Sequence, residues 1–276
     1  MRVAAIIPVA LILIGWLCFA GQIEASPGEI NSKQVAYHQV RLPAGNAMPN
    51  IQSKSGLKRI LALRVEFVRD TLMTTTGDGT FDYGTDDTLY FDPPPHDSLF
   101  FADNLEFLRF YWDKMSSGEI DIEYDIYPPG AQASYQLPRQ MWQYNYNQSD
   151  EQLDRGLAQL FYDAVVAADE SGHITNWHEY DLVMIFHAGA GAEFDLGFTT
   201  TPHDLPSAWL IEEDLRIIDV YDGVPVDGGN YYIDGGIILP ETETHEGVQI
   251  SMAGVICSLF GHWLGLPALY DRDDGK

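Results

Sequence analysis

The sequence contains very little cysteine. Its 276 residues include only two, Cys18 and Cys257. Scaffolds that depend on disulfides carry more cysteines, at regular spacings. Two cysteines therefore exclude a disulfide framework, and the fold must be held together by a hydrophobic core. The composition allows such a core, because 46% of the residues are hydrophobic and 12% are aromatic.

Basic residues are the second shortage. Only 15 lysines and arginines stand against 41 acidic residues, which gives a net charge of −26. A face that binds nucleic acid needs clustered lysine and arginine to neutralise phosphates, and attraction to anionic lipid needs the same. The composition therefore excludes nucleic acid as a partner and disfavours an electrostatic membrane contact. The length fits one large domain or two small ones.

The N-terminal residues have the pattern of a secretory signal. Arg2 precedes an apolar run over residues 3–20, and small residues end that run. Cleavage after Ala20 or after Ala25 fits, so residues 1–25 are predicted to be a signal peptide. The alternative, an uncleaved membrane anchor, is weakened by a proline and a glycine within the run. The pattern predicts secretion, to the extracellular space or the cell envelope, without stable membrane insertion after cleavage.

The rest of the chain divides into a short leader and one domain. Residues 26–58 are polar and contain several prolines, which predicts a leader or linker. Residues 59–276 are predicted to form the domain. Within it, aliphatic runs, alternation of charged and apolar residues, and apolar spacings of three and four mark strands and helices. Strands are predicted over 59–68, 119–127, 180–187, 209–221 and 231–239, and helices over 99–115, 149–170 and 252–264.

The last predicted helix and the turn after it carry the most specific motif. Residues 254–271 read GVICSLFGHWLGLPALYD. This segment resembles the active-site segment of secreted zinc metallopeptidases of the immune-inhibitor-A type, whose pattern is G-V-x-x-H-E-x-G-H-x-L-G-L-P-D-L-Y-D. Weaker resemblance extends upstream to residues 117–124, 180–191 and 201–207, so that it covers the chain from about Arg59 onward.

The resemblance implies both a fold and an activity. The fold would be a zincin-like α+β domain, with a twisted mixed sheet, packed helices and a buried active-site-type helix. The activity would be zinc-dependent hydrolysis of peptide bonds. In this family a lower subdomain with a Met-containing turn follows the motif. Because the chain stops at Lys276, the expectation is a domain that is truncated at its C-terminal end and lacks that subdomain.

The catalytic atoms of the motif are almost all replaced. Two histidines at i and i+4 lie on one helix face and can bind one zinc ion, and the glutamate after the first histidine serves as general base. In this family a third ligand, usually Asp, follows ten residues after the first histidine. The first histidine falls at Ser258, the base at Leu259, the second histidine at His262 and the third ligand at Ala268. Only His262 keeps a ligand of the family type.

This pattern predicts a relative without catalysis and without zinc. The substitutions fall on atoms that bind metal or move protons, whereas Gly261, Gly265 and Pro267 are kept. That distribution favours selected inactivation over random drift. Such a pseudo-peptidase would act by binding a peptide or a protein partner. Two alternatives stay open: an active metallopeptidase with an atypical zinc site, and a non-functional fragment. Whether the chain is an enzyme is therefore left undecided by its sequence.

Three other features are weaker candidates for function. Acidic loops can bind Ca²⁺, although solvated loops are the simpler interpretation. His187 ends a predicted strand and can line a cleft, although a hydrogen-bonded strand-end histidine is simpler. Cys257 is expected to be a core residue rather than a nucleophile. The acidic residues concerned are Asp78, Asp82, Asp86, Asp87 and Asp92 in one loop and Asp271, Asp273 and Asp274 in another.

Overall fold

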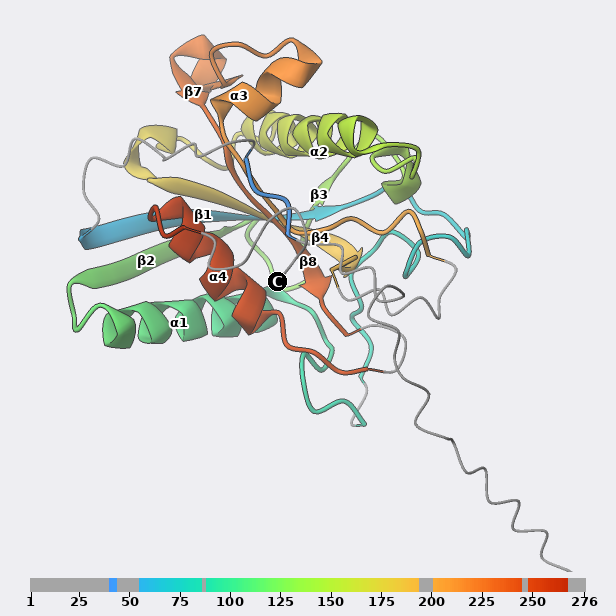
Figure 1. Ribbon diagram of the computed structural model, residues 1–276, viewed down its shortest axis with the longest axis horizontal. Helices are drawn as coiled ribbons and strands as arrows, with labels where there is room; N and C mark the ends of the chain where they lie inside the picture. Colours follow the sequence, from blue (N-terminus) through green and yellow to red (C-terminus); the bar gives the residue numbers. More distant parts are fainter. Residues whose placement is uncertain (1–39, 44–54, 86–87, 194–200, 245–247, 268–276) are drawn as a thin grey trace, which may run out of the picture. The chain divides into compact units, whose positions relative to one another are not determined.

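The computed structural model describes residues 40–43, 55–85, 88–193, 201–244 and 248–267. Their secondary structure consists of strands, four α-helices and a few short 3₁₀ turns (Figure 1). The helices are α1 (Ser98–Met115), α2 (Asp150–Glu170), α3 (Glu212–Leu215) and α4 (Ala253–Trp263). The strands are β1 (Gly56–Glu66), β2 (Ile120–Tyr127), β3 (Tyr135–Gln136), β4 (Leu182–Ala190), β5 (Ala208–Leu210), β6 (Val224–Val226), β7 (Tyr231–Ile233) and β8 (Gly236–Thr242).

The main sheet is mixed. Its strand order is β2-β1-β4-β8-β5, and β3 pairs with the end of β1. Strands β2, β1, β4 and β8 are parallel to one another, whereas the edge strand β5 is antiparallel to β8. Strands β6 and β7 form a separate antiparallel pair. At this coarse level the predicted α+β class with a mixed sheet is confirmed.

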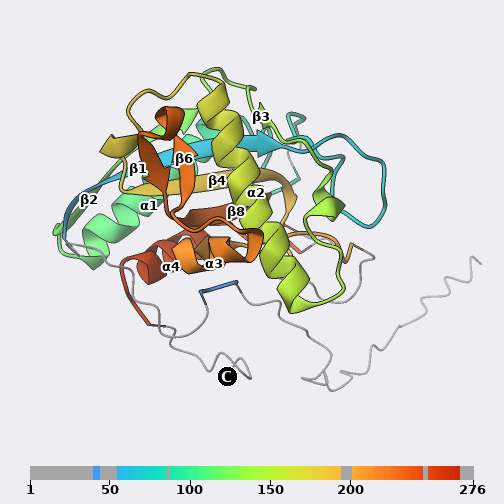
Figure 2. The ribbon, with the colours of Figure 1, turned by 90° about the horizontal axis from the view of Figure 1, so that it is seen from above.

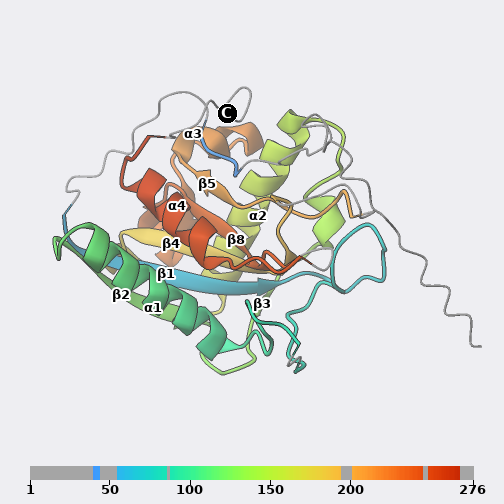
Figure 3. The same ribbon diagram turned by 60° about the horizontal axis from the view of Figure 1, so that its bottom comes forward.

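Helices cover both faces of the sheet. Helix α2 lies across one face, and α1 and α4 lie on the opposite face (Figures 1 and 2). A parallel sheet covered on both faces requires strands that are apolar on both sides. All nine residues of β4 are buried, as the nearly continuous apolar run over 180–187 predicts. Helices α1 and α4 lie side by side (Figure 3), where the rings of Trp112 and Phe260 are 5.6 Å apart.

Helix α2 forms as its sequence predicts. The Ser149 hydroxyl caps its first turn by accepting a hydrogen bond of 3.3 Å from the Gln152 N–H. Its apolar side, including Leu157 and Phe161, is fully buried. The helix also approaches the preceding segment closely, because a Cβ at Gly156 would overlap with the main-chain carbonyl of Tyr144. Only glycine allows that approach.

Two predicted strands differ from the structure. The strand predicted over 209–221 is wrong beyond Leu210, because helix α3 begins at Glu212. Three acidic residues in its first turn favour the helix N-terminus, and the Asp214 carboxylate accepts from the Ile211 N–H at 2.9 Å. The strand predicted over 231–239 is divided into β7 and β8. Among the residues that the structure describes, no helix is both long and apolar enough to span a bilayer.

The contact at Gly156 gives a test of the fold. Alanine normally stabilises a helix relative to glycine by roughly 0.5–1 kcal/mol. We expect Gly156→Ala instead to destabilise the protein by about 1–3 kcal/mol, because α2 must move away from Tyr144. Gly254→Ala in α4 is the matched control, since its Cβ would meet nothing within 4 Å. Urea denaturation should show opposite signs for the two variants; two stabilising changes would refute the close approach.

Candidate functional site

Helix α4, which carries the motif, is fixed at its start by Asp92. The Asp92 carboxylate accepts from the Met252 N–H at 2.8 Å and from the Ser251 hydroxyl at 3.3 Å. It therefore accepts hydrogen bonds at the N-terminal end of α4, where the N-cap residue itself, Met252, provides no side-chain cap. Burial raises the pKa of Asp92, and these two hydrogen bonds oppose that rise.

The end of α4 is a tight glycine turn, as the motif predicts. Gly265 has a φ of 89°, a left-handed conformation that glycine adopts without strain. Its N–H donates to the His262 carbonyl at 2.8 Å, and the Leu266 N–H donates to the Gly261 carbonyl at 2.9 Å. This pair of hydrogen bonds is the Schellman motif that commonly ends helices. The turn of the motif is therefore present in this chain.

His262 has a defined orientation. Its side chain is nearly buried, and Nδ1 lies 2.9 Å from the main-chain oxygen of Leu266. A carbonyl oxygen only accepts, so Nδ1 is the donor of this hydrogen bond and Nε2 is the other ring nitrogen. The same orientation is common among histidines that bind metals through Nε2. The imidazole is thus arranged as a ligand, although a single imidazole does not define a zinc site.

The other motif positions do not supply zinc ligands. Ser258 is exposed, one turn before His262, and offers only a neutral hydroxyl. Leu259 is fully buried in the hydrophobic core. Ala268 lies outside the described residues and has no donor atom in its side chain. Among the residues that the structure describes, no three of His, Cys, Asp or Glu come together so that they can hold a metal. The residues at this position do not fit zinc.

Comparisons with known proteins do not assign the chain to a family. No family model matches the chain, and no curated protein matches it significantly. The resemblance to zinc metallopeptidases therefore remains a prediction from the motif in residues 254–271 and from the weaker upstream similarity.

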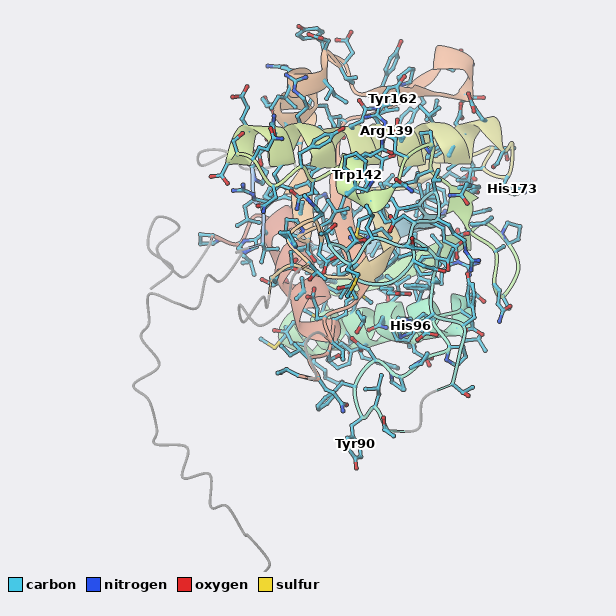
Figure 4. All side chains as sticks on the ribbon, turned by 90° about the vertical axis from the view of Figure 1, so that its right-hand side faces the viewer. Tyr90, His96, Arg139, Trp142, Tyr162 and His173 are labelled. Atoms are coloured by element: carbon cyan, nitrogen blue, oxygen red, sulfur yellow. The ribbon has the colours of Figure 1, made fainter. Side chains whose placement is uncertain are left out.

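A second group of polar side chains, which sequence reasoning missed, lies at the carboxyl ends of the parallel strands. The centre of this group is Glu241 near the end of β8. Its carboxylate lies 3.1 Å from Nδ1 of His96 and accepts from the Gly189 N–H at 3.1 Å. Nε2 of His96 lies 2.9 Å from the Asp92 carbonyl oxygen. His96 lies on the α1 side of the molecule (Figure 4). Because both its ring nitrogens face acceptors, the protonated form of the His96 ring is favoured.

The two fully buried histidines have opposite electrostatic environments. Burial lowers the pKa of His96, but the hydrogen bond and charge of Glu241, together with the Asp92 carbonyl and the charge of Asp82, leave its pKa raised. His187 on β4 has no such partner. Burial lowers the pKa of His187 to about 4, so it stays neutral. Its Nδ1 lies 2.9 Å from the Ala188 oxygen, which fits the simpler interpretation of a hydrogen-bonded strand histidine.

The remaining sequence candidates have local structural partners. The Asp78 carboxylate accepts from the Thr80 hydroxyl at 2.6 Å, and that of Asp82 accepts from the Gly84 N–H at 2.8 Å. Asp86, Asp87, Asp271, Asp273 and Asp274 lie outside the described residues. Burial raises the pKa of Cys257 to about 12, as expected of a core thiol. None of these contacts points to a calcium ion in the predicted loops.

The pKa shifts predict how the two buried histidines titrate. We expect His96 to stay protonated above pH 6.5, and its contribution to stability to be lost as the pH rises through its raised pKa. His187 should stay neutral down to about pH 4, and its contribution should be lost as the pH falls from 6.5 through 4. Histidine ¹³C NMR can follow both rings, with His96→Gln and His187→Gln used for assignment. Two rings that titrate together near pH 6.5 would contradict this difference.

Proposed function

We propose that this chain is a secreted, catalytically inactive relative of zinc metallopeptidases, with a zincin-like fold, that acts by binding an extended peptide. The position of α4 carries the first part of the proposal. The helix packs against the sheet, ends in the glycine turn of the motif and orients His262 as a ligand. The catalytic atoms around this scaffold are replaced. Zinc would supply a polarised water molecule, and nothing at Leu259 can accept its proton.

Burial of Leu259 strengthens the case for inactivity. An active relative needs a carboxylate at this position, directed at the metal-bound water. Leu259 is fully buried instead, within the continuous hydrophobic core. A carboxylate at this position would be removed from water without a partner, which is costly. The surroundings of position 259, and not only its residue type, are therefore unsuited to general-base catalysis.

The edge of strand β5 supports the second part of the proposal. Residues 40–43, from the predicted leader, lie along this edge (Figure 3). The Arg41 N–H donates to the Ser207 carbonyl at 2.9 Å, and the Arg41 carbonyl accepts from the Trp209 N–H at 2.9 Å. These are the main-chain hydrogen bonds by which an extended peptide joins a sheet. The edge therefore accepts a peptide segment, and in this structure the segment is the chain's own.

Two carboxylates on α2 recognise the side chain of this segment. The Arg41 guanidinium forms ion pairs with Asp150 at 2.7 Å and with Asp154 at 3.6 Å. Both carboxylates are largely exposed, so each pair contributes at most about 1 kcal/mol. Their role is selection: an arginine at this position of a bound peptide is favoured over an acidic residue. The net charge of −26 favours a basic peptide in the same direction.

The inactive site predicts the metal content of the purified protein. After dialysis against a weak chelator, the protein should contain no stoichiometric zinc and should show no phenanthroline-sensitive cleavage of casein. The physical reasons are one ligand in place of three and a missing general base, a role worth roughly a hundred- to ten-thousand-fold in rate. Stoichiometric zinc in the protein would revive the atypical active peptidase.

A gain of zinc provides the positive control. Ser258 is exposed, so Ser258→His should fold and place an imidazole one turn from His262. Zinc affinity should rise measurably in Ser258→His and rise further when Ala268→Asp is added. The matched control, Ser258→His with His262→Ala, should lose the gain. If Ser258→His folds without gaining zinc affinity, the alignment of α4 with the family motif is wrong.

Peptide binding can be tested with the leader sequence itself. The probe is a fluorescein-labelled peptide with the sequence of residues 38–45. The full chain carrying Arg41→Pro lacks the Arg41 N–H and guanidinium, so its edge should be free and should bind the probe at least tenfold more tightly than the wild type does. In the wild type the tethered segment competes at a high effective concentration. Fluorescence anisotropy measures both affinities.

A charge-reversed probe is the control for this experiment. The same peptide with glutamate in place of its arginine should bind Arg41→Pro several-fold more weakly, because Asp150 and Asp154 then repel it. Equal binding of the two peptides would remove the proposed selection by α2. No binding of either peptide to Arg41→Pro would contradict peptide binding at this edge.

A further inference from the structure

Two glutamates meet in the interior at the carboxyl ends of β4 and β8. Glu193 follows β4 and Glu243 follows β8, and their side chains are 5% and 0% exposed. A Cβ at Gly191 would collide with Oε2 of both, so the two Oε2 atoms converge beside this glycine. Any other residue at position 191 would displace the carboxylates. The chain thus keeps a space for this pair between two neighbouring strands.

In both glutamates, Oε1 accepts a hydrogen bond and Oε2 does not. Ser207 donates hydrogen bonds to Oε1 of both carboxylates. Its N–H donates to Glu193, and its hydroxyl donates to Glu243 at 3.4 Å. Oε2 of Glu193 and Oε2 of Glu243 are buried, and no donor group among the described residues hydrogen-bonds to either atom. Buried carboxylate oxygens without partners are rare in folded proteins and call for an explanation. Here the two partnerless atoms are also the two that converge.

The charges around the pair do not balance it. None of the ion pairs in the described part of the chain involves Glu193 or Glu243. The His96 ring pairs with Glu241, and Asp92 adds a further negative charge that acts on Glu243. Two buried carboxylates without a compensating charge are strongly unfavourable. Burial raises the pKa of Glu193, and burial together with the charge of Glu193 raises the pKa of Glu243 well above its ordinary value. A proton shared between the two carboxyl groups removes the cost in part, and a cation from outside the chain removes it in full.

We propose that Glu193 and Glu243 bind a hard divalent cation, Ca²⁺ or Mg²⁺, through their two converging Oε2 atoms. Both ions prefer carboxylate oxygens, and Mg²⁺ in particular binds through one or two carboxylates while it keeps several waters. Zinc is a poorer match, because no histidine or thiolate joins the pair. The bound ion links the ends of β4 and β8 to Ser207, the residue just before β5. It stabilises the fold and is independent of catalysis and of the motif on α4.

Thermal melting of the full chain tests this site. The melting temperature is compared in EDTA, in excess CaCl₂ and in excess MgCl₂, at fixed pH and ionic strength. An ion present at about a hundred times its dissociation constant should raise the melting temperature of the wild type by roughly 5 °C. The response to the two salts identifies the preferred ion. No rise with either salt overturns the proposal and leaves a proton shared between the two carboxyl groups.

Isosteric variants locate the ion. Glu243→Gln and Glu193→Gln should lose the rise, and in EDTA each should melt at or above the wild-type temperature because the repulsion between the two carboxylates is gone. Glu119→Gln, at an exposed glutamate remote in sequence from the pair, is the matched control and should keep the full rise. If the rise persists in both pair variants, the ion binds elsewhere and the proposal is wrong.

Discussion

The arrangement of the chain at the carboxyl ends of the parallel strands depends on the hydrogen bonds of the Glu241 carboxylate. This carboxylate accepts from the main-chain N–H groups of Asp82 and Gly189 and pairs with the His96 ring, all at 3.1 Å. These partners come from the loop after β1, from β4 and from the segment before α1. An alkyl side chain in place of this carboxylate would leave three donors without an acceptor, two of them buried. Through His96 the same contact reaches Asp92, which holds the first turn of α4.

Regular elements were predictable because their signals are local. The apolar run of β4, the Ser149 cap of α2 and the Gly265 turn of α4 each depend on residues within a few positions of one another. The strand predicted over 209–221 failed because aliphatic residues there mask an acidic helix start at Glu212. Short apolar stretches do not distinguish a strand from a helical turn, and tertiary packing decides between them.

The candidate sites were predictable only in part, for a physical reason. Ser258, Leu259 and His262 stand in one motif, so their positions on α4 follow from helical periodicity. Glu193, Ser207 and Glu243 are brought together by the order of strands, which no local pattern encodes. Ser207 belongs to both proposed binding sites. Its carbonyl accepts from the Arg41 N–H, and its own N–H and hydroxyl donate to the two glutamates. Binding of a peptide at the β5 edge is therefore expected to change the affinity of the glutamate pair for its cation, and the reverse.

The burial of Leu259 has an evolutionary consequence. Under the proposal that this chain descends from an active metallopeptidase, loss of the general base would have removed activity in one step and could at first have been reversed in one step. Once an aliphatic side chain at this position has become part of the core, its neighbours adapt to its shape, and a returning glutamate destabilises the fold before it can restore any chemistry. Restoration then requires several simultaneous changes. Under the same proposal the substitution is difficult to reverse, and selection would then retain the scaffold only for a function other than hydrolysis.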